Sequence, residues 1–175
     1  MAINTLIWNN NRMLDNTDRK ILSLLQKDAR MPNAEIARRL KMAPSGILER
    51  LRKLKDRDII KEYVAHLDPK ALDFGLLAFV YIKTNEKRVK WDVGEIVSKI
   101  PGVLEVHDIA GDECYVVKLR TKDTESLYRL LRDDFGSIDA IASTRTTIVL
   151  RTLKETSDLP LELKGEASTR SKRED

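Results

Sequence analysis

The sequence predicts an α+β protein with an N-terminal tri-helical helix-turn-helix domain, a strand linker and a C-terminal ferredoxin-like domain of order βαββαβ. Three observations predict this architecture. Apolar residues recur at helical spacing in the first third of the chain, and alternating runs typical of strands prevail after position 76. Lysine and arginine are in excess only in the first part of the chain.

Three short helices are predicted in the first domain. The first covers LDNTDRKILSLLQKDAR (residues 14–30) with Asp15 as its N-cap, and the second covers NAEIARRLK (33–41). After a short connector, Pro44 suits the first turn of a third helix. Its predicted buried positions are Ile47, Leu48, Leu51 and Leu54. Two helices joined so closely are typical of a helix-turn-helix.

A linking strand is predicted at IIKEYVAHL (59–67), followed by a turn-rich connector. The second domain then presents strands at 76–84, 103–110, 114–121 and 140–153, with helices at 89–100 and 124–135. The predicted boundaries are 1–13 for an N-terminal extension, 14–62 for the helix-turn-helix domain, 63–75 for the strand and linker, 76–155 for the second domain, and 156–175 for a polar tail expected to be disordered.

Charge is distributed unevenly between the two domains. Residues 1–66 carry 14 Lys/Arg against 8 Asp/Glu, whereas residues 67–175 carry 18 against 20. This imbalance predicts a polyanionic partner for the first domain only, although a solvated helical surface is the alternative that composition leaves open. One cysteine, Cys114, excludes an internal disulfide and favours the cytoplasm. No apolar stretch approaches the roughly 20 residues of a membrane span.

The exposed side of the third helix is predicted to bind double-stranded DNA. Ser45 and Gly46 make its first turn small, and Gly46 costs about 1 kcal/mol relative to Ala, which indicates close approach of a partner. Basic side chains farther along suit phosphates. An ordinary surface helix with an incidental glycine is the alternative. The predicted DNA-binding residues are Arg38, Arg39, Lys41, Ser45, Gly46, Glu49, Arg50, Arg52 and Lys53.

Several motifs recur here in a specific order and spacing: LDNTDRKILSLLQKDAR, NAEIARRL, the recognition-helix stretch, IIKEYVAHLDPKAL, IPGV (100–103), the Gly111 loop and TRTTIVLRTLKE. Together, from Leu14 to about Glu155, they resemble the Lrp/AsnC family of transcriptional regulators. The resemblance implies a RAM-type second domain and homodimers that assemble further, commonly to octamers. This chain departs from the family pattern at Lys41 and Asp58, where glycine is usual, and at Gly46.

The resemblance also implies an effector site in the second domain, at contacts between dimers. The family's loop pattern Gly-x-x-Asp ends here in Cys114. A glycine-hinged loop can offer N–H groups to a carboxylate, and a nearby acid can hold an ammonium group. A hairpin turn with acids facing water is the alternative. The predicted effector-binding residues are Gly111, Asp112, Glu113, Cys114, Thr144 and Thr146.

No catalytic, metal or cofactor site is predicted, because His66, His107 and Cys114 complete neither a triad nor a metal-ligand cluster. The prediction is a DNA-binding transcriptional regulator that recognises pseudo-palindromic promoter sites as a dimer or higher oligomer, modulated by an amino acid or related metabolite. An architectural DNA-organising protein without an effector is the first alternative. An enzyme similar to siroheme decarboxylases, which resemble this family in both domains, is the second.

Overall fold

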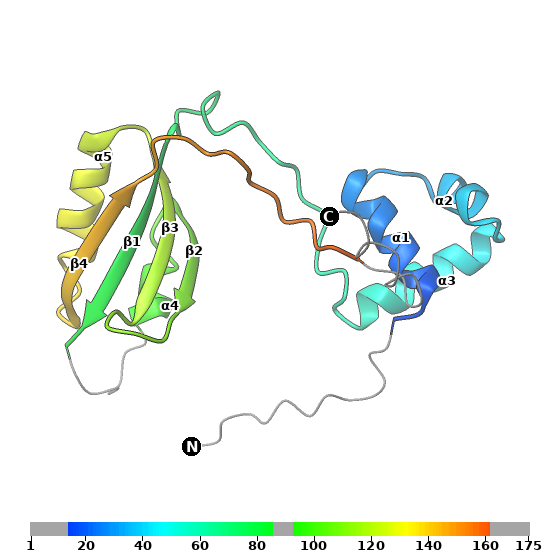
Figure 1. Ribbon diagram of the computed structural model, residues 1–175, viewed down its shortest axis with the longest axis horizontal. Helices are drawn as coiled ribbons and strands as arrows, with labels where there is room; N and C mark the ends of the chain where they lie inside the picture. Colours follow the sequence, from blue (N-terminus) through cyan, green and yellow to red (C-terminus); the bar gives the residue numbers. More distant parts are fainter. Residues whose placement is uncertain (1–13, 86–92, 162–175) are drawn as a thin grey trace, which may run out of the picture. The chain divides into compact units, whose positions relative to one another are not determined.

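A computed structural model describes residues 14–85 and 93–161 of the 175-residue chain (Figure 1). The chain divides into two compact units, Met1–Ala65 with Thr156–Asp175, and His66–Glu155. Within the described residues, no helix has both the length and the apolar character needed to cross a membrane. The predicted N-terminal extension, the start of the helix at 89–100 and the tail beyond position 161 lie outside the described residues.

Three helices build the first unit, which confirms the predicted tri-helical arrangement. They are α1 (Asn16–Lys27), α2 (Asn33–Leu40) and α3 (Pro44–Asp56). Asp15 caps α1 through a capping box, in which Asp15 accepts from the backbone of Asp18 and Asp18 accepts in return. The apolar core gathers side chains from all three helices and the turn after α1: Ile21, Leu25, Met31, Ile36, Ala37, Ile47, Leu51 and Leu54.

The prediction that Leu48 is buried was wrong, because 59% of this residue is exposed. Ile47 and Leu51 lie in the buried sector of α3, between α3 and the other helices. Each step along a helix turns by about 100°, so Leu48 lies just past the margin of that sector and faces outward.

Two turns in the first unit need a left-handed backbone. Lys41, at the end of α2, has φ 54°, and Asp58, after α3, has φ 53°. These are the two positions where the resemblance led us to expect glycine. Glycine is usual at such positions for a steric reason. A residue without Cβ adopts positive φ without penalty and is therefore common where a helix ends.

The segment predicted as a linking strand, residues 59–67, pairs with no strand among the described residues. Its apolar side chains Tyr63, Val64 and Leu67 are exposed. Alternation alone does not make a strand, because the backbone N–H and C=O groups need a neighbouring chain to complete a ladder.

The second unit is a four-stranded antiparallel sheet of order β2-β3-β1-β4, with helices on one face (Figure 1). The strands are β1 (Leu76–Thr84), β2 (Val103–Asp108), β3 (Tyr115–Thr121) and β4 (Ile141–Ile148). The helices are α4 (Val93–Val97), α5 (Thr124–Arg129) and a π-helical continuation, η2 (Leu130–Phe135). This order confirms the predicted βαββαβ topology and places β4 at a sheet edge. β4 ends at Ile148, before the predicted position 153. The N–H of Val149 still donates to the carbonyl of Leu77 at 2.9 Å, but β1 begins at Leu76, so residues 151–153 lie beyond its start.

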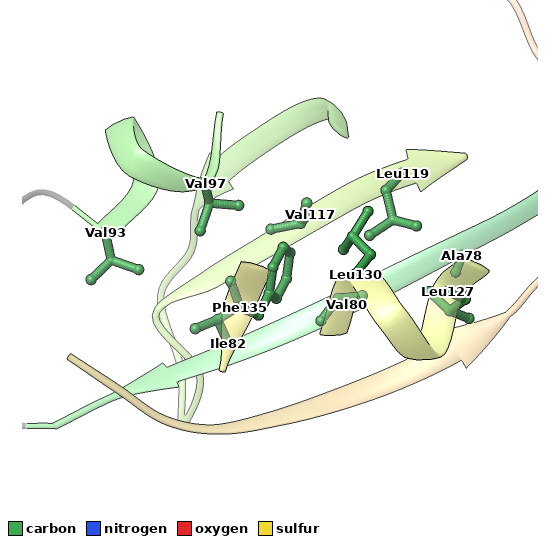
Figure 2. Close-up of a cluster of buried hydrophobic side chains, with 10 residues drawn as sticks. All are labelled: Ala78, Val80, Ile82, Val93, Val97, Val117, Leu119, Leu127, Leu130 and Phe135. Carbon is green, nitrogen blue, oxygen red and sulfur yellow. The ribbon is translucent and has the colours of Figure 1, made fainter. Parts of the chain in front are cut away.

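Alternation along β1 divides the sheet into two different faces. Ala78, Val80 and Ile82 are fully buried against the helices. They pack with Val117 and Leu119 of β3 and with helical side chains such as Phe135 (Figure 2). Alternate residues Phe79, Tyr81 and Lys83 point to the opposite face, which we call the open face because no helix of the described chain covers it.

The chain after the second unit returns to the first unit. The side-chain amide of Gln26 in α1 donates to the carbonyl oxygen of Leu159 at 3.0 Å and accepts from its N–H at 2.9 Å. One glutamine thus satisfies both backbone groups of Leu159, as a strand neighbour would.

We expect Asp58→Gly to raise the free energy of unfolding of the first unit by about 1 kcal/mol, because glycine relieves the cost of positive φ. Denaturant unfolding followed by circular dichroism measures this change. The matched control is Asp56→Gly, the same replacement at a helical position, which should lower stability instead. Equal effects at both positions would show that backbone conformation at Asp58 is not the cause.

Candidate DNA interface and effector pocket

The first turn of α3 presents small side chains. Ala43 is the N-cap and makes no side-chain capping bond, and Pro44 follows it. Pro44 has no N–H, and the N–H of Gly46 donates to the carbonyl of Ala43 at 3.0 Å, which leaves the N–H of Ser45 as the donor of this turn. Ser45 is exposed at the same place. This end of the helix therefore combines low bulk with one exposed hydroxyl, that of Ser45.

Gly46 is not required by packing within the protein. A Cβ added there would meet only Met42 Cε at 3.7 Å, an ordinary van der Waals distance. Glycine in a helix costs about 1 kcal/mol relative to alanine, so the chain gains no stability from it. Packing within the described chain therefore gives no reason for glycine at this position.

Four of the basic residues along α2 and α3 are paired with acids on the same helix. Glu49 lies 3.0 Å from Arg52 Nη2 and 3.3 Å from Lys53 Nζ, and Arg52 and then Lys53 lower the pKa of its carboxyl. Glu35 binds Arg38 and Arg39 in the same way.

The Glu35 distances are 2.8 Å to Arg38 Nη2 and 2.6 Å to Arg39 Nε. These hydrogen bonds, led by that of Arg38, lower the pKa of Glu35 to about 2. All four cations are largely exposed, so water and salt screen these pairs. Phosphates can therefore compete with the two glutamates for them.

Arg50 differs from the other predicted DNA-binding residues, because its side chain binds α1. Its Nη1 lies 2.7 Å from Asp15 Oδ2 and 2.7 Å from Asp18 Oδ1. Burial raises the pKa of Asp15, but the N–H of Asp18 and the Arg50 guanidinium outweigh it and hold that pKa below its usual value. Arg50 therefore ties α3 to the capping box of α1 and fixes the position of the helix.

Two further residues complete the surface around α3. Lys41, one of the predicted DNA-binding residues, is exposed in the turn before the helix. Leu48 is a candidate that sequence reasoning missed, because we assigned it to the core. An exposed leucine on a recognition helix suits the methyl group of thymine, and a stricter helical wheel would have placed it outside.

A hollow of about 270 Å³ lies in the second unit, at the end of the β1–β4 pair. It is smaller than the roughly 300 Å³ at which pockets for drug-sized ligands begin, so it suits a small metabolite. Asp112 and Glu113 form one side, and the strands contribute Tyr81, Lys83, Ser143, Thr144 and Arg145. Three of the predicted effector-binding residues, Asp112, Glu113 and Thr144, therefore line one hollow. Thr144 pairs with the buried Ile82, so its side chain lies on the helical side of β4.

Two cross-strand residue pairs on the open face form the floor of the hollow. Tyr81 pairs with Arg145 across the strands, and Lys83 pairs with Ser143. The Arg145 guanidinium carbon lies 4.1 Å from the centroid of the Tyr81 ring, and Arg145 Nη2 lies 2.8 Å from Glu113 Oε1. The hydrogen bond from Arg145 lowers the pKa of Glu113, which keeps this carboxylate ionised.

The other predicted effector residues do not line the hollow. Gly111 has φ 147°, but a Cβ there would meet nothing within 4 Å, so the loop needs glycine for its conformation rather than for close approach. The N–H of Cys114 donates to the carbonyl of Ile82 at 2.8 Å and is therefore used within the sheet. Thr146 pairs with Val80, so its side chain lies on the helical side of β4, opposite Arg145.

Cys114 makes a local contact with Thr84. Their Sγ and Oγ1 atoms lie 3.2 Å apart, and this hydrogen bond lowers the pKa of the thiol. Among the described residues, no group of three or more His, Cys, Asp or Glu side chains is arranged to hold a metal ion.

A three-helix unit with a basic third helix, joined to a ferredoxin-like unit with a charged hollow, defines a DNA-binding protein with a ligand domain. Comparison with known families supports both assignments. Residues 14–61 match a winged helix-turn-helix DNA-binding domain, and residues 77–159 match the Lrp/AsnC ligand binding domain. The chain belongs to the Lrp/AsnC family of transcriptional regulators.

Individual relatives agree with this assignment. The chain is 41% identical over 148 residues to the HTH-type transcriptional regulator FL11 of Pyrococcus horikoshii, covering 85% of this chain and 97% of the relative. It is 37% identical over 150 residues to the leucine-responsive regulatory protein of Escherichia coli, covering 83% and 90%.

Among solved structures, the fold resembles a transcriptional regulator of Neisseria meningitidis in complex with L-Met. The TM-score is 0.80 at 32% identity, covering 85% of this chain and 97% of the other. The relatives are transcriptional regulators, which fits the prediction of a non-enzymatic protein.

We expect Arg50→Met to lower the free energy of unfolding of the first unit by about 2 kcal/mol, since the partly buried Asp18 loses its cation. Denaturant unfolding measures it, with Arg52→Met, at an exposed position of the same helix, as the control. The Asp15 contribution is present above about pH 4 and is lost as the pH falls through its lowered folded pKa. Stability should therefore fall less between pH 5 and pH 3 in Arg50→Met than in the wild type, and an equal fall would contradict the assignment.

Proposed function

We propose that this regulator binds pseudo-palindromic promoter sites as a dimer or higher oligomer and that an amino acid or a related metabolite modulates its binding. The observation that carries the DNA part is the exposed side of α3, which is small at Ser45 and Gly46 and basic at Arg52 and Lys53. That order suits a first turn in the major groove, with phosphates met farther along the helix.

The proposed dimer uses the open face of the sheet. Phe79 and Val116 lie there half-buried without helical cover in the described chain, whereas Tyr81 on the same face belongs to the floor of the hollow. Two copies facing each other would bury this apolar centre, and a two-fold dimer matches a pseudo-palindromic site. Assembly beyond the dimer follows from the family resemblance.

The proposed effector site is the hollow beside Asp112 and Glu113. A solved relative carries L-Met, and another relative is named for its response to leucine. A ligand bound beside the open face changes DNA affinity if it prefers one assembly state. We place this activity in the cytoplasm, where a regulator of transcription in such a family meets its DNA.

Gly46→Ala tests whether DNA approaches the start of α3. We expect this variant to be more stable than the wild type by up to about 1 kcal/mol, because alanine favours the helix and its Cβ fits. Its affinity for a selected operator should nevertheless fall about tenfold or more, since the methyl group stands between backbone and base edges. Thermal unfolding and a fluorescence-anisotropy titration measure the two effects. A variant with unchanged affinity would remove Gly46 from the interface.

The double variant Arg52→Ala/Lys53→Ala tests the phosphate contacts. We expect weaker binding to specific and random duplexes alike, and a slope of log K against log salt that is shallower by about 2. Arg132→Ala, at an exposed position paired with Asp133 in the second unit, is the control and should keep the full slope. Unchanged affinity of the double variant would overturn the recognition-helix assignment, and featureless footprints on DNA would favour an architectural protein.

Phe79→Lys tests the open-face dimer. A lysine on that face should prevent association, because it places a charge in the apolar centre of the interface. Sedimentation velocity should show a monomer for this variant and a dimer or its multiples for the wild type. Tyr128→Lys, an equivalent change at a 55% exposed position of α5, should leave the assembly intact. A Phe79→Lys protein that sediments like the wild type would exclude this face.

A further inference from the structure

The chain that follows β4 crosses the sheet and is held on the open face by two ion pairs. Glu155 Oε1 lies 2.7 Å from Lys118 Nζ, and Glu155 Oε2 lies 3.0 Å from Arg120 Nη2. Both cations belong to β3, where they alternate with residues buried under the helices and therefore point to the open face. Since β1 lies between β4 and β3, the chain passes β1 to reach them. We call residues 149–155 the strap.

The strap lies at one end of the open face. The N–H of Val149 donates to the carbonyl of Leu77 at 2.9 Å, and Leu77 pairs with Arg120 across the β1–β3 ladder. Leu77 is only 6% exposed, although alternation places it on the open face. Phe79 and Val116, farther along the same face, are only half-buried. The face therefore has a covered end at Leu77 and a barer part around Phe79 and Val116.

The charges that hold the strap balance one another. Lys118 Nζ also lies 2.9 Å from Glu105 Oε1 on β2, so two cations meet two carboxylates. The hydrogen bond from Lys118 lowers the pKa of Glu155 and keeps this carboxylate ionised. The side chains of Lys118 and Arg120 are already mostly buried within the single chain. Charges that are paired in this way can be buried further without leaving an uncompensated ion.

Two leucines of the strap point away from the rest of the described chain. Leu150 is 98% exposed and Leu153 is 80% exposed. Scattered apolar residues on a surface are ordinary. These two lie three residues apart on a segment that Glu155 holds in place, at the end of a face whose remaining part is apolar and half-buried. Their burial against an apolar surface would be favourable.

A second copy of the chain offers that surface. In a two-fold contact both copies use the same patch, so a raised part of one copy has to meet a lower part of the other. The strap is the raised part of the open face, and the strip around Phe79 and Val116 is the lower part. A half-turn about an axis that runs across the strands brings the covered end of each face over the barer part of the other.

We propose that the strap is a docking arm for a second copy of this chain. Leu150 and Leu153 of each copy pack on the strip around Phe79 and Val116 of the other copy, and Glu155 holds the strap in position for this contact. This inference rests on the proposed open-face dimer and names the segment that completes it. It makes the dimer depend on residues that follow the sheet as well as on the sheet itself.

The double variant Leu150→Glu/Leu153→Glu tests the arm. The dissociation constant of the dimer, measured by sedimentation velocity over a dilution series, should rise at least about tenfold. Because both side chains are exposed in the single chain, the far-UV circular dichroism spectrum should stay that of the wild type. The control is Tyr128→Glu, at a 55% exposed position on the helical side of the sheet, and it should associate like the wild type.

Glu155→Gln tests the part that holds the strap. This change keeps the size of the side chain but leaves Lys118 and Arg120 with a single carboxylate, that of Glu105. The dimer should again dissociate at least about tenfold more readily. Glu125→Gln, which removes an exposed carboxylate on α5, is the matched control and should leave the dissociation constant unchanged.

Cross-linking tests the contact between copies directly. In a Cys114→Ser background, protein carrying Leu153→Cys is mixed with protein carrying Val116→Cys and oxidised. A disulfide that joins one chain of each kind, identified by mass spectrometry, is expected because the strap of one copy lies on the strip of the other. Protein carrying Tyr128→Cys in place of Leu153→Cys should give no such product.

The possible failures are distinguishable. If the wild type is a monomer, or if Phe79→Lys sediments like the wild type, the proposed open-face dimer fails and the docking arm fails with it. If Phe79→Lys is monomeric while the double leucine variant keeps the wild-type dissociation constant, or if the two cysteine proteins do not cross-link, the dimer stands and the docking arm is overturned. A wild-type dissociation constant for Glu155→Gln would overturn the role of Glu155.

Discussion

Alternation along β1 is the constraint on which the second unit depends. This strand lies inside the sheet and pairs with both β3 and β4. The pairing on both sides fixes the face of the sheet to which each of its side chains points. Val80 and Ile82 pack against the helices, whereas Tyr81 and Lys83 stand on the open face. A shift of register by one residue would bury a lysine and expose the core. The apolar packing of one face thus fixes the position of the charges on the other.

The sequence predicted most of the fold because the fold depends on local periodicity. The three helices, the order of the strands and the N-cap at Asp15 all follow from spacing within a few residues. The linking strand at 59–67 could not be settled in this way, because a strand exists only with a partner. Leu48 was misplaced because it lies at the margin of an apolar sector, where a small rotation decides between core and solvent.

The candidate sites were less predictable, because their key contacts join residues far apart in sequence. The residues next to Arg50 in the sequence do not indicate that it binds Asp15 and Asp18. Its charge alone therefore suggested a contact with DNA. Arg145 was overlooked for the same reason, since Glu113 and Tyr81 reach it only after β1 and β4 have paired. The loop acids were found through the family resemblance, whose glycine loop pattern is local in the sequence.

The ion pairs along α2 and α3 have a consequence for how a duplex would be read. If phosphates take both Arg52 and Lys53, as the proposed DNA contacts require, Glu49 loses these two partners while it stands next to a polyanion. A carboxylate in that position needs a new donor, such as the exocyclic amino group of cytosine. Base pairs that offer none leave an uncompensated negative charge facing the DNA. Glu49 would then contribute to specificity by weakening binding to unsuitable DNA sequences. The sites that the protein occupies would be set more by the sequences it rejects than by those it binds best.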